Sequence, residues 1–329
     1  MDYIDIIKDV PFTPDKIETT LIGSTIQPFI EANTIPSSLA DIKKNHIIPV
    51  YIKDNETLIS HADFIEATLD AVNSVYYNER ILQPIVRVSH PIKGRVPEAK
   101  NKAANDLYEW EKTIYYERMA FAIEIPSIQG VVGENTLSLT IGGVKSFSQD
   151  NLYSKKGSDE TFHVFIGFQN KACTNMKIWS DGFMGNLKVS SVGQLTACIK
   201  TMVERYSSGL HLHQMQQLTK YRLTEMQFAT IIGKCRMYQH LPYDLKKGIH
   251  PLHMGDTQIG MVCKEYFKDS NFCCDADGGI DLWKLFNLFT GANKSSYIDS
   301  FLDRSVNAFN LVEQIKYGLE NINHCWYLS

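Results

Sequence analysis

The sequence predicts an α+β protein with a central, mainly antiparallel sheet, helices packed on one face of it and a helical C-terminal half. Two patterns lead to this prediction. Between about residues 81 and 185, apolar residues alternate with polar ones, as in half-buried strands. From about residue 190 the apolar residues recur at helical spacing instead. Strands followed by helices indicate helices that cover a sheet, rather than an alternating α/β order.

Four segments have the alternation of strands: 85–89, 119–125, 137–141 and 162–169. In the third, Ser138 and Thr140 point away from the leucines that flank them, so one face of the strand is apolar. Gly142, Gly143 and residues 180–182 are expected to form turns or bulges between strands.

The predicted helices have recognisable beginnings. A helix over about 61–80 starts near Ser60 or His61, and residues 224–227 form a capping box that opens a helix stopped by Pro242. A second box at 296–299 opens a long helix. The apolar stripe of that helix comprises Ile298, Phe301, Leu302, Phe309, Val312 and Leu319.

The chain divides into two parts. Residues 1–45 contain four prolines among scattered Ser and Thr, which predicts an irregular or partly ordered N-terminal arm. Residues 46–329 are expected to form a single α+β domain, sheet-rich over 81–185 and helical over 186–329.

Composition limits the function classes. The hydrophobic fraction is 44% and the charged fraction 21%, as in a globular protein with a core, and the net charge is −4. Nucleic-acid binding would therefore have to come from a local basic patch. No apolar run approaches the ~20 residues of a membrane span. The first residues do not have the pattern of a signal peptide. We expect a cytoplasmic protein with no membrane contact.

No catalytic, metal or cofactor site is predicted. The seven cysteines include no C-x-x-C pair, so reduced thiols are expected. His211 and His213 would share one side of a strand but diverge on a helix, and His250 and His253 form a second pair. A metal would need further ligands from the fold. The phosphate-loop, Rossmann, G-x-S-x-G and H-E-x-x-H motifs do not occur.

The densest basic cluster lies in a predicted loop over 91–102, which a short helical turn at about 105–111 follows. It comprises Lys93, Arg95, Lys100 and Lys102. Aromatic residues come soon after: Tyr108, Trp110, Tyr115 and Tyr116. Charges for phosphates and flat rings for bases are what single-stranded DNA or RNA requires. The alternative is a solvated loop followed by core aromatics.

A second group of candidates lies on the polar face of the predicted sheet, where Arg87, Arg118, Glu124 and His163 would project together. These side chains could bind a polar ligand or form cross-strand ion pairs. Arg87 and Arg118 could also extend the nucleic-acid surface. Lys294, before a helix start, could help to hold an anion through free backbone N–H groups, and Arg304 lies nearby on the helix.

Several longer strings of the sequence carry a resemblance to a known family. They lie at 90–97, 115–126, 165–175, 227–238, 282–290 and 294–304. From about residue 85 to its end, the chain resembles a Bacteroidetes family that has only a domain-of-unknown-function label. More distantly, it is similar to the phage/plasmid-like protein family. The resemblance implies a bacterial chromosome, phage or conjugative element as the source, and it implies no reaction.

Three functions are consistent with these observations. The leading hypothesis is a non-enzymatic accessory protein of a mobile element that binds single-stranded nucleic acid. The second is an enzyme that uses Glu124 or His163 with Arg118 on the polar sheet face. The third is a protein-interaction factor, for example one that blocks a host defence system or self-associates, and the acidic net charge suits it better than DNA binding.

Overall fold

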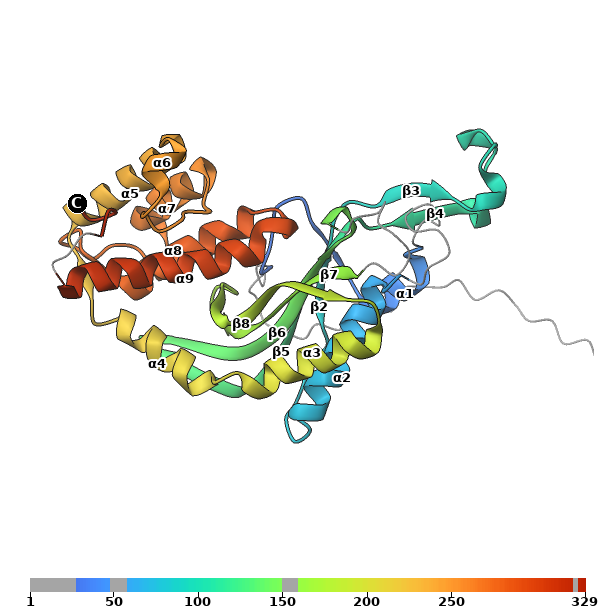
Figure 1. The fold of residues 1–329 in the computed structure, drawn as a ribbon, viewed down its shortest axis with the longest axis horizontal. Helices are drawn as coiled ribbons and strands as arrows, with labels where there is room; N and C mark the ends of the chain where they lie inside the picture. Colours follow the sequence, from blue (N-terminus) through green and yellow to red (C-terminus); the bar gives the residue numbers. More distant parts are fainter. Residues whose placement is uncertain (1–27, 48–57, 150–158, 322–324) are drawn as a thin grey trace, which may run out of the picture.

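The computed structural model describes residues 28–47, 58–149, 159–321 and 325–329. Within these residues the chain forms a six-stranded antiparallel sheet with the order β1-β2-β5-β6-β7-β8 (Figure 1). The strands are β1 (Ile35–Ser37), β2 (Ile85–Val88), β5 (Arg118–Val132), β6 (Asn135–Ser146), β7 (Glu160–Asn170) and β8 (Met176–Val189). The α+β class and the antiparallel sheet are therefore confirmed, and all four predicted strands are present.

Helices lie on both faces of the sheet (Figure 1). The first face is covered by α2 (His61–Val75), α3 (Val192–Arg205) and α4 (Ser208–Leu218). There Phe64 of α2 packs edge-on against Phe121 and Phe162. The long helix α9 (Ile298–Asn321) lies along the opposite face. The predicted helices on one face are therefore present, and α9 adds a helix on the other.

The remaining helices follow the sheet in the sequence and pack beside α9. They are α5 (Glu225–His240), α6 (Tyr243–Lys246), α7 (Asp256–Lys268) and α8 (Leu282–Ala292), with the short pair β9 (Arg222–Leu223) and β10 (Ile280–Asp281). The predicted capping box of α5 is present, because the Gln227 amide donates to Thr224 Oγ1 at 3.2 Å. No helix in the described ranges is long and apolar enough to cross a membrane.

The start of α2 was predicted correctly, and its end was not. The predicted start near Ser60 is present, and Ser60 caps the helix in a reciprocal box with Asp63. The helix ends at Val75 and not near residue 80, because the chain leaves helical geometry at Tyr76.

The described part of the predicted N-terminal arm is irregular over residues 28–34 and then forms a strand and a helix. β1 pairs with β2, and Ser38 then caps the short helix α1 (Leu39–Asn45). Pro36 is compatible with β1 because an edge strand needs hydrogen bonds on one side only. Residues 1–27 lie outside the described residues.

The predicted loop over 91–102 is corrected. β3 (Ile92–Arg95) pairs with β4 (Lys112–Tyr115), and the two form a ribbon that projects from the sheet (Figure 1). The predicted turn at 105–111 consists of two short 3-10 turns, Ala104–Asp106 and Glu109–Glu111, after a third at Pro97–Ala99. We call residues 91–115 the arm.

The two glycines of β6 are neither a turn nor a bulge, because Gly142 and Gly143 pair continuously with β5 and β7. A side chain has no room there: a Cβ on Gly142 would lie 2.1 Å from the Phe121 carbonyl oxygen. At Gly143 it would lie 2.3 Å from Cζ of Phe64. Residues 180–182, by contrast, lie at a shift in the β7–β8 register, which is a bulge inside β8.

The close contact at Gly142 gives a stability prediction. Because the nearest atom is backbone of the neighbouring strand, Gly142→Ala is expected to lower the free energy of unfolding by about 1–3 kcal/mol or more. Gly193→Ala is the control: nothing lies within 4 Å of its Cβ position on α3, and Ala favours helix by as much as about 1 kcal/mol. Urea denaturation measures both, and equal effects would contradict the prediction.

Buried histidines predict loss of stability in acid. Burial lowers the pKa of His211 from 6.5 to about 3, and its ring packs against Phe168, Trp179 and Phe309. Below pH 6.5 the unfolded chain binds a proton that the folded chain does not, so stability falls as pH falls from 6.5 toward 3. Each such histidine contributes a slope of about 1.4 kcal/mol per pH unit.

Urea titrations between pH 7 and pH 4 test this dependence. The variant His211→Gln should reduce the slope by about one proton, or about 1.4 kcal/mol per pH unit. His213→Gln, at an exposed position two residues further along α4, should leave the slope unchanged. An unchanged slope in His211→Gln would disprove the assignment.

Candidate nucleic-acid interface

The arm is fixed at its root to the sheet and to two helices. The Tyr116 amide donates to Nδ1 of His46 at 3.1 Å, and its carbonyl oxygen contacts Nε2 of His61 at 2.8 Å. The rings of His46 and His61 stack at 4.7 Å, and Phe147 stacks on His61 at the same distance. Burial lowers the pKa of His46 to about 4, so this aromatic stack is uncharged at neutral pH.

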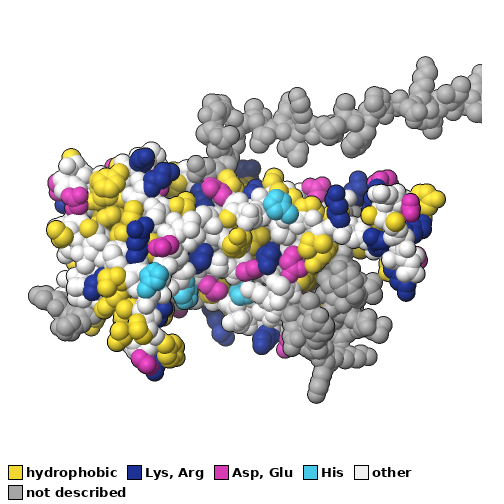
Figure 2. All heavy atoms as spheres, turned by 90° about the horizontal axis from the view of Figure 1, so that it is seen from above, with side chains coloured by type: hydrophobic (Ala, Val, Ile, Leu, Met, Phe, Trp, Pro, Cys, Tyr) yellow, Lys and Arg dark blue, Asp and Glu magenta, His cyan; other side chains and the backbone are white. Residues whose placement is uncertain are grey.

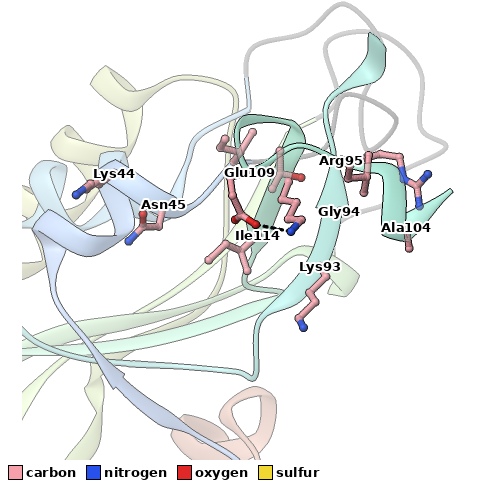
Figure 3. A pocket seen from close by; sticks show the side chains of 12 residues that line it. Lys44, Asn45, Lys93, Gly94, Arg95, Ala104, Glu109 and Ile114 are labelled. Carbon is pink, nitrogen blue, oxygen red and sulfur yellow. Dashed lines mark hydrogen bonds and ion pairs between the residues drawn. The ribbon is translucent and has the colours of Figure 1, made fainter. Parts of the chain in front are cut away.

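One face of the ribbon carries the basic side chains of both strands. The register pairs Lys93 with Ile114 and Arg95 with Lys112, so these four side chains share a face. A hollow of about 780 Å³ lies along this side, and Lys44 at the end of α1 also lines it (Figure 3). We call it the arm hollow.

The basic groups surround the arm hollow and do not converge on one point. In Figure 3 the ends of Lys44, Lys93 and Arg95 point in different directions. Lys112 forms an ion pair with Glu109 at the edge of the hollow. Spread charges of this kind suit a chain of phosphates better than a single small anion.

The tip of the arm presents two exposed aromatic rings. Tyr108 and Trp110 are 62% and 69% exposed, and their rings are nearly parallel with centroids 6.1 Å apart. The Lys102 ammonium lies 4.6 Å from the centre of the Tyr108 ring. Large apolar rings usually gain free energy by burial, so this exposed pair beside a cation is a candidate contact surface.

A buried carboxylate holds the tip in shape. Glu111 is buried, accepts from the Tyr108 amide at 2.9 Å and forms an ion pair with Lys102 at 2.5 Å. The hydrogen bond from Lys102 is the main reason that the pKa of Glu111 lies below its ordinary value. Arg95 also donates to the Lys102 carbonyl oxygen, so the ribbon and its tip are joined.

Charge within the arm is close to balanced. Its basic residues are Lys93, Arg95, Lys100, Lys102 and Lys112, and its acidic residues are Glu98, Asp106, Glu109 and Glu111. Two of the acids are neutralised locally, by Lys102 and Lys112. Figure 2 shows basic and hydrophobic side chains together at the outer end of the arm, among acidic ones. The arm is thus more positive than the chain as a whole.

The six predicted nucleic-acid residues separate into two places. Four of them belong to the arm, whereas Arg87 and Arg118 lie in the sheet. Arg87 donates to the carbonyl and hydroxyl oxygens of Thr34, both at 2.8 Å. Arg118 forms an ion pair with Asp299 of α9 at 2.5 Å. Both arginines therefore join the sheet to neighbouring segments.

The sheet-face candidates do share one face, as the alternation predicted. The register aligns Arg87 with Ala120, and through β6 with His163, in one row across four strands. The structure nevertheless separates them: His163 contacts the Gln149 side chain at 2.9 Å, and burial lowers its pKa. Glu124 and Arg87 line a second cavity, which His163 does not reach.

Lys294 and Arg304 have structural contacts instead of a shared anion site. Lys294 is buried and donates to the Cys173 carbonyl oxygen and, at 3.0 Å, to Thr174 Oγ1. Arg304 donates to Ser296 Oγ at 2.7 Å and to the His253 carbonyl oxygen at 2.9 Å. These bonds connect α8 and α9 to the turn between β7 and β8 and to the segment before α7.

The described residues contain no group of three or more His, Cys, Asp or Glu side chains that could hold a metal ion. All seven cysteines are described, and each is a free thiol. His211 is buried and His213 exposed on α4, so the two rings diverge, as expected for a helix.

Sequence reasoning missed two basic residues of the arm hollow. Lys44 comes from α1, about fifty residues before β3, and only the fold brings it near. Lys112 carried a usable signal: Thr113, Ile114 and Tyr115 after it are residue types that favour strands, and this strand could have been paired with 92–95.

Comparisons with known proteins identify a family but no relative of established activity. The family model described as "Domain of unknown function, B. Theta Gene description (DUF3871)" matches residues 15–328. In the searches against curated proteins and solved structures, nothing matched the chain. Because the family match spans the sheet, the arm and the C-terminal helices, the chain belongs to this Bacteroidetes-type family of domains of unknown function.

Proposed function

We propose that the arm binds single-stranded nucleic acid and that the protein is a non-enzymatic accessory of a mobile genetic element. The observation that carries the binding proposal is the exposed, parallel pair Tyr108 and Trp110 with Lys102 beside it. Exposed rings next to cations are the means by which proteins hold unpaired bases and phosphates without reading a sequence.

The shape of the arm supports an extended ligand. A strand whose bases stack at the tip can continue along the basic face of the ribbon, past Arg95, Lys93 and Lys112. A duplex keeps its bases stacked inside and offers none to the rings, so the arm should prefer single strands. The net charge of −4 limits binding to this local surface.

The mobile-element part of the proposal rests on the distant resemblance of the sequence to the phage/plasmid-like protein family. Such elements expose single strands during transfer and replication, which gives a binding protein of this kind a substrate. The arm itself contains no arrangement of nucleophile, base and acid, so a binding role fits it better than catalysis.

Fluorescence anisotropy with labelled single- and double-stranded oligonucleotides, at two salt concentrations, tests the proposal. We expect tighter binding to single strands. The double variant Tyr108→Ser/Trp110→Ser should weaken it by about 1–3 kcal/mol per stacked base, roughly 5- to 140-fold in Kd. Absence of binding at low salt would refute the proposal, and a search for a protein partner would follow.

Matched variants separate stacking from charge. Tyr77→Ser/Tyr243→Ser removes two exposed rings outside the arm and should leave binding unchanged. Lys93→Ala/Lys100→Ala should reduce the dependence of binding on salt by about 0.7 in log–log slope for each phosphate that the variant no longer neutralises. Lys188→Ala/Lys220→Ala, with two exposed lysines elsewhere, should not. Equal effects of both lysine pairs would mean nonspecific attraction and would count against the arm.

A further inference from the structure

A second cavity, of about 900 Å³, lies on the face of the sheet that α9 leaves partly uncovered. Its floor is formed by neighbouring strands: Glu124 on β5, Ser138 on β6 and Gln169 on β7. Ser138 and Gln169 are a direct cross-strand pair, and Glu124 projects from the same face one pair further along. The volume is within the range of small-molecule sites, about 300–1,000 Å³.

Several polar groups on this floor are without partners in the described part of the chain. The Gln169 side chain is only 6% exposed and makes no hydrogen bond there, and the Glu124 carboxylate has no hydrogen-bond or ion-pair partner. Ser138 Oγ and Asn170 Nδ2 are buried and likewise unpaired among the described residues. Buried polar groups are nearly always hydrogen-bonded, and Ser138 Oγ and Asn170 Nδ2 are two exceptions beside this cavity, where Gln169 and the partly exposed Glu124 offer further polar atoms.

The rim of the cavity is cationic and its side wall apolar. Arg80, Arg87 and Lys171 line it, against the single carboxylate of Glu124. Arg87 uses Nε and Nη2 for Thr34, and its Nη1 has no partner among the described residues. Leu82, Ile85 and Pro126 supply apolar surface. The ligand should therefore combine an anionic group with a flat or apolar part that carries hydrogen-bonding edges.

The turn that borders the cavity is held in an uncommon conformation. Thr174 has a φ of 55°, which is unfavourable for a β-branched residue. Its amide donates to the Asn170 carbonyl oxygen at 2.8 Å, and Lys294 donates to its hydroxyl. These contacts fix the wall formed by Asn170, Lys171 and Thr174, so the cavity is pre-formed.

We propose that this cavity binds a nucleotide, free or as one unit of a strand. Glu124 and Gln169 present acceptors and donors to the edge of the base, as carboxylates and side-chain amides do in base recognition. Lys171 and Arg87 take the phosphate, and the apolar wall covers the face of the base. The site is separate from the arm and does not depend on the function proposed for it.

Isothermal titration of the full chain with the four ribonucleoside 5′-monophosphates tests this. At least one should bind with a Kd below about 1 mM, and inorganic phosphate should bind at least ten-fold more weakly. Gln169→Leu and Lys171→Ala should each weaken the binding at least five-fold. Glu124→Gln should change the order of preference among the four bases, because an amide donates where the carboxylate only accepts.

Controls keep the test decisive. Lys171 is exposed, so the nucleotide binding of Lys171→Ala can be measured even if Gln169→Leu fails to fold. Lys188→Ala on β8 and Glu134→Gln in the β5–β6 turn are matched exposed changes that should leave nucleotide binding intact. No binding of any monophosphate, equal binding of phosphate, or no effect of Lys171→Ala together with Glu124→Gln would each overturn the proposal.

Two further measurements distinguish the sources of the nucleotide and the two sites. Monophosphate binding should persist in Tyr108→Ser/Trp110→Ser, and its loss there would place the nucleotide on the arm and overturn the proposal. If Gln169→Leu also weakens binding of a single-stranded oligonucleotide, the cavity takes one unit of a strand. If only monophosphate binding weakens, the ligand is a free nucleotide.

Discussion

The burial of β6 on both faces is the constraint around which the sheet is organised. Phe64 of α2 reaches the strand from one side, and Phe165 from β7 approaches Gly142 on the other. Neither contact leaves room for a Cβ, so the two glycines set how closely the helix layer and the neighbouring strands approach. The second cavity takes its floor from this central strand and its neighbours, because Glu124, Ser138 and Gln169 lie on β5, β6 and β7.

Electrostatics inside the fold follow from the same tight packing. Lys145 and Glu160 form a buried ion pair at 3.0 Å between β6 and β7, and Glu160 also accepts from the Ile59 amide at 2.9 Å near the start of α2. Lys177 has no carboxylate near it among the described residues and donates to Thr290 Oγ1 at 2.6 Å, and burial lowers its pKa to about 7. The interior therefore accommodates an amine either by pairing it with a carboxylate or by lowering its pKa, which favours the neutral form.

The sequence was informative wherever large apolar residues occupy one face of an element and smaller or polar residues the other. Alternation and capping boxes predicted β5, β7, α5 and the start of α2. The ribbon of the arm was missed because neither of its faces is buried, so its residues show no apolar period. Of the site, the basic cluster and its aromatics were visible in sequence. The separation of Arg87 and Arg118 was not, because Thr34 and Asp299 approach them from distant segments.

The low burial of the arm has an evolutionary consequence. Apart from the buried Ala99 and Glu111, the residues between 97 and 111 are at least partly exposed, so insertions and substitutions there leave the sheet intact. On β6 the opposite holds, since even a methyl group displaces backbone. We therefore expect relatives of this chain to diverge first at the tip of the arm, so that one scaffold can acquire different contact specificities while Gly142 and its neighbours stay the same.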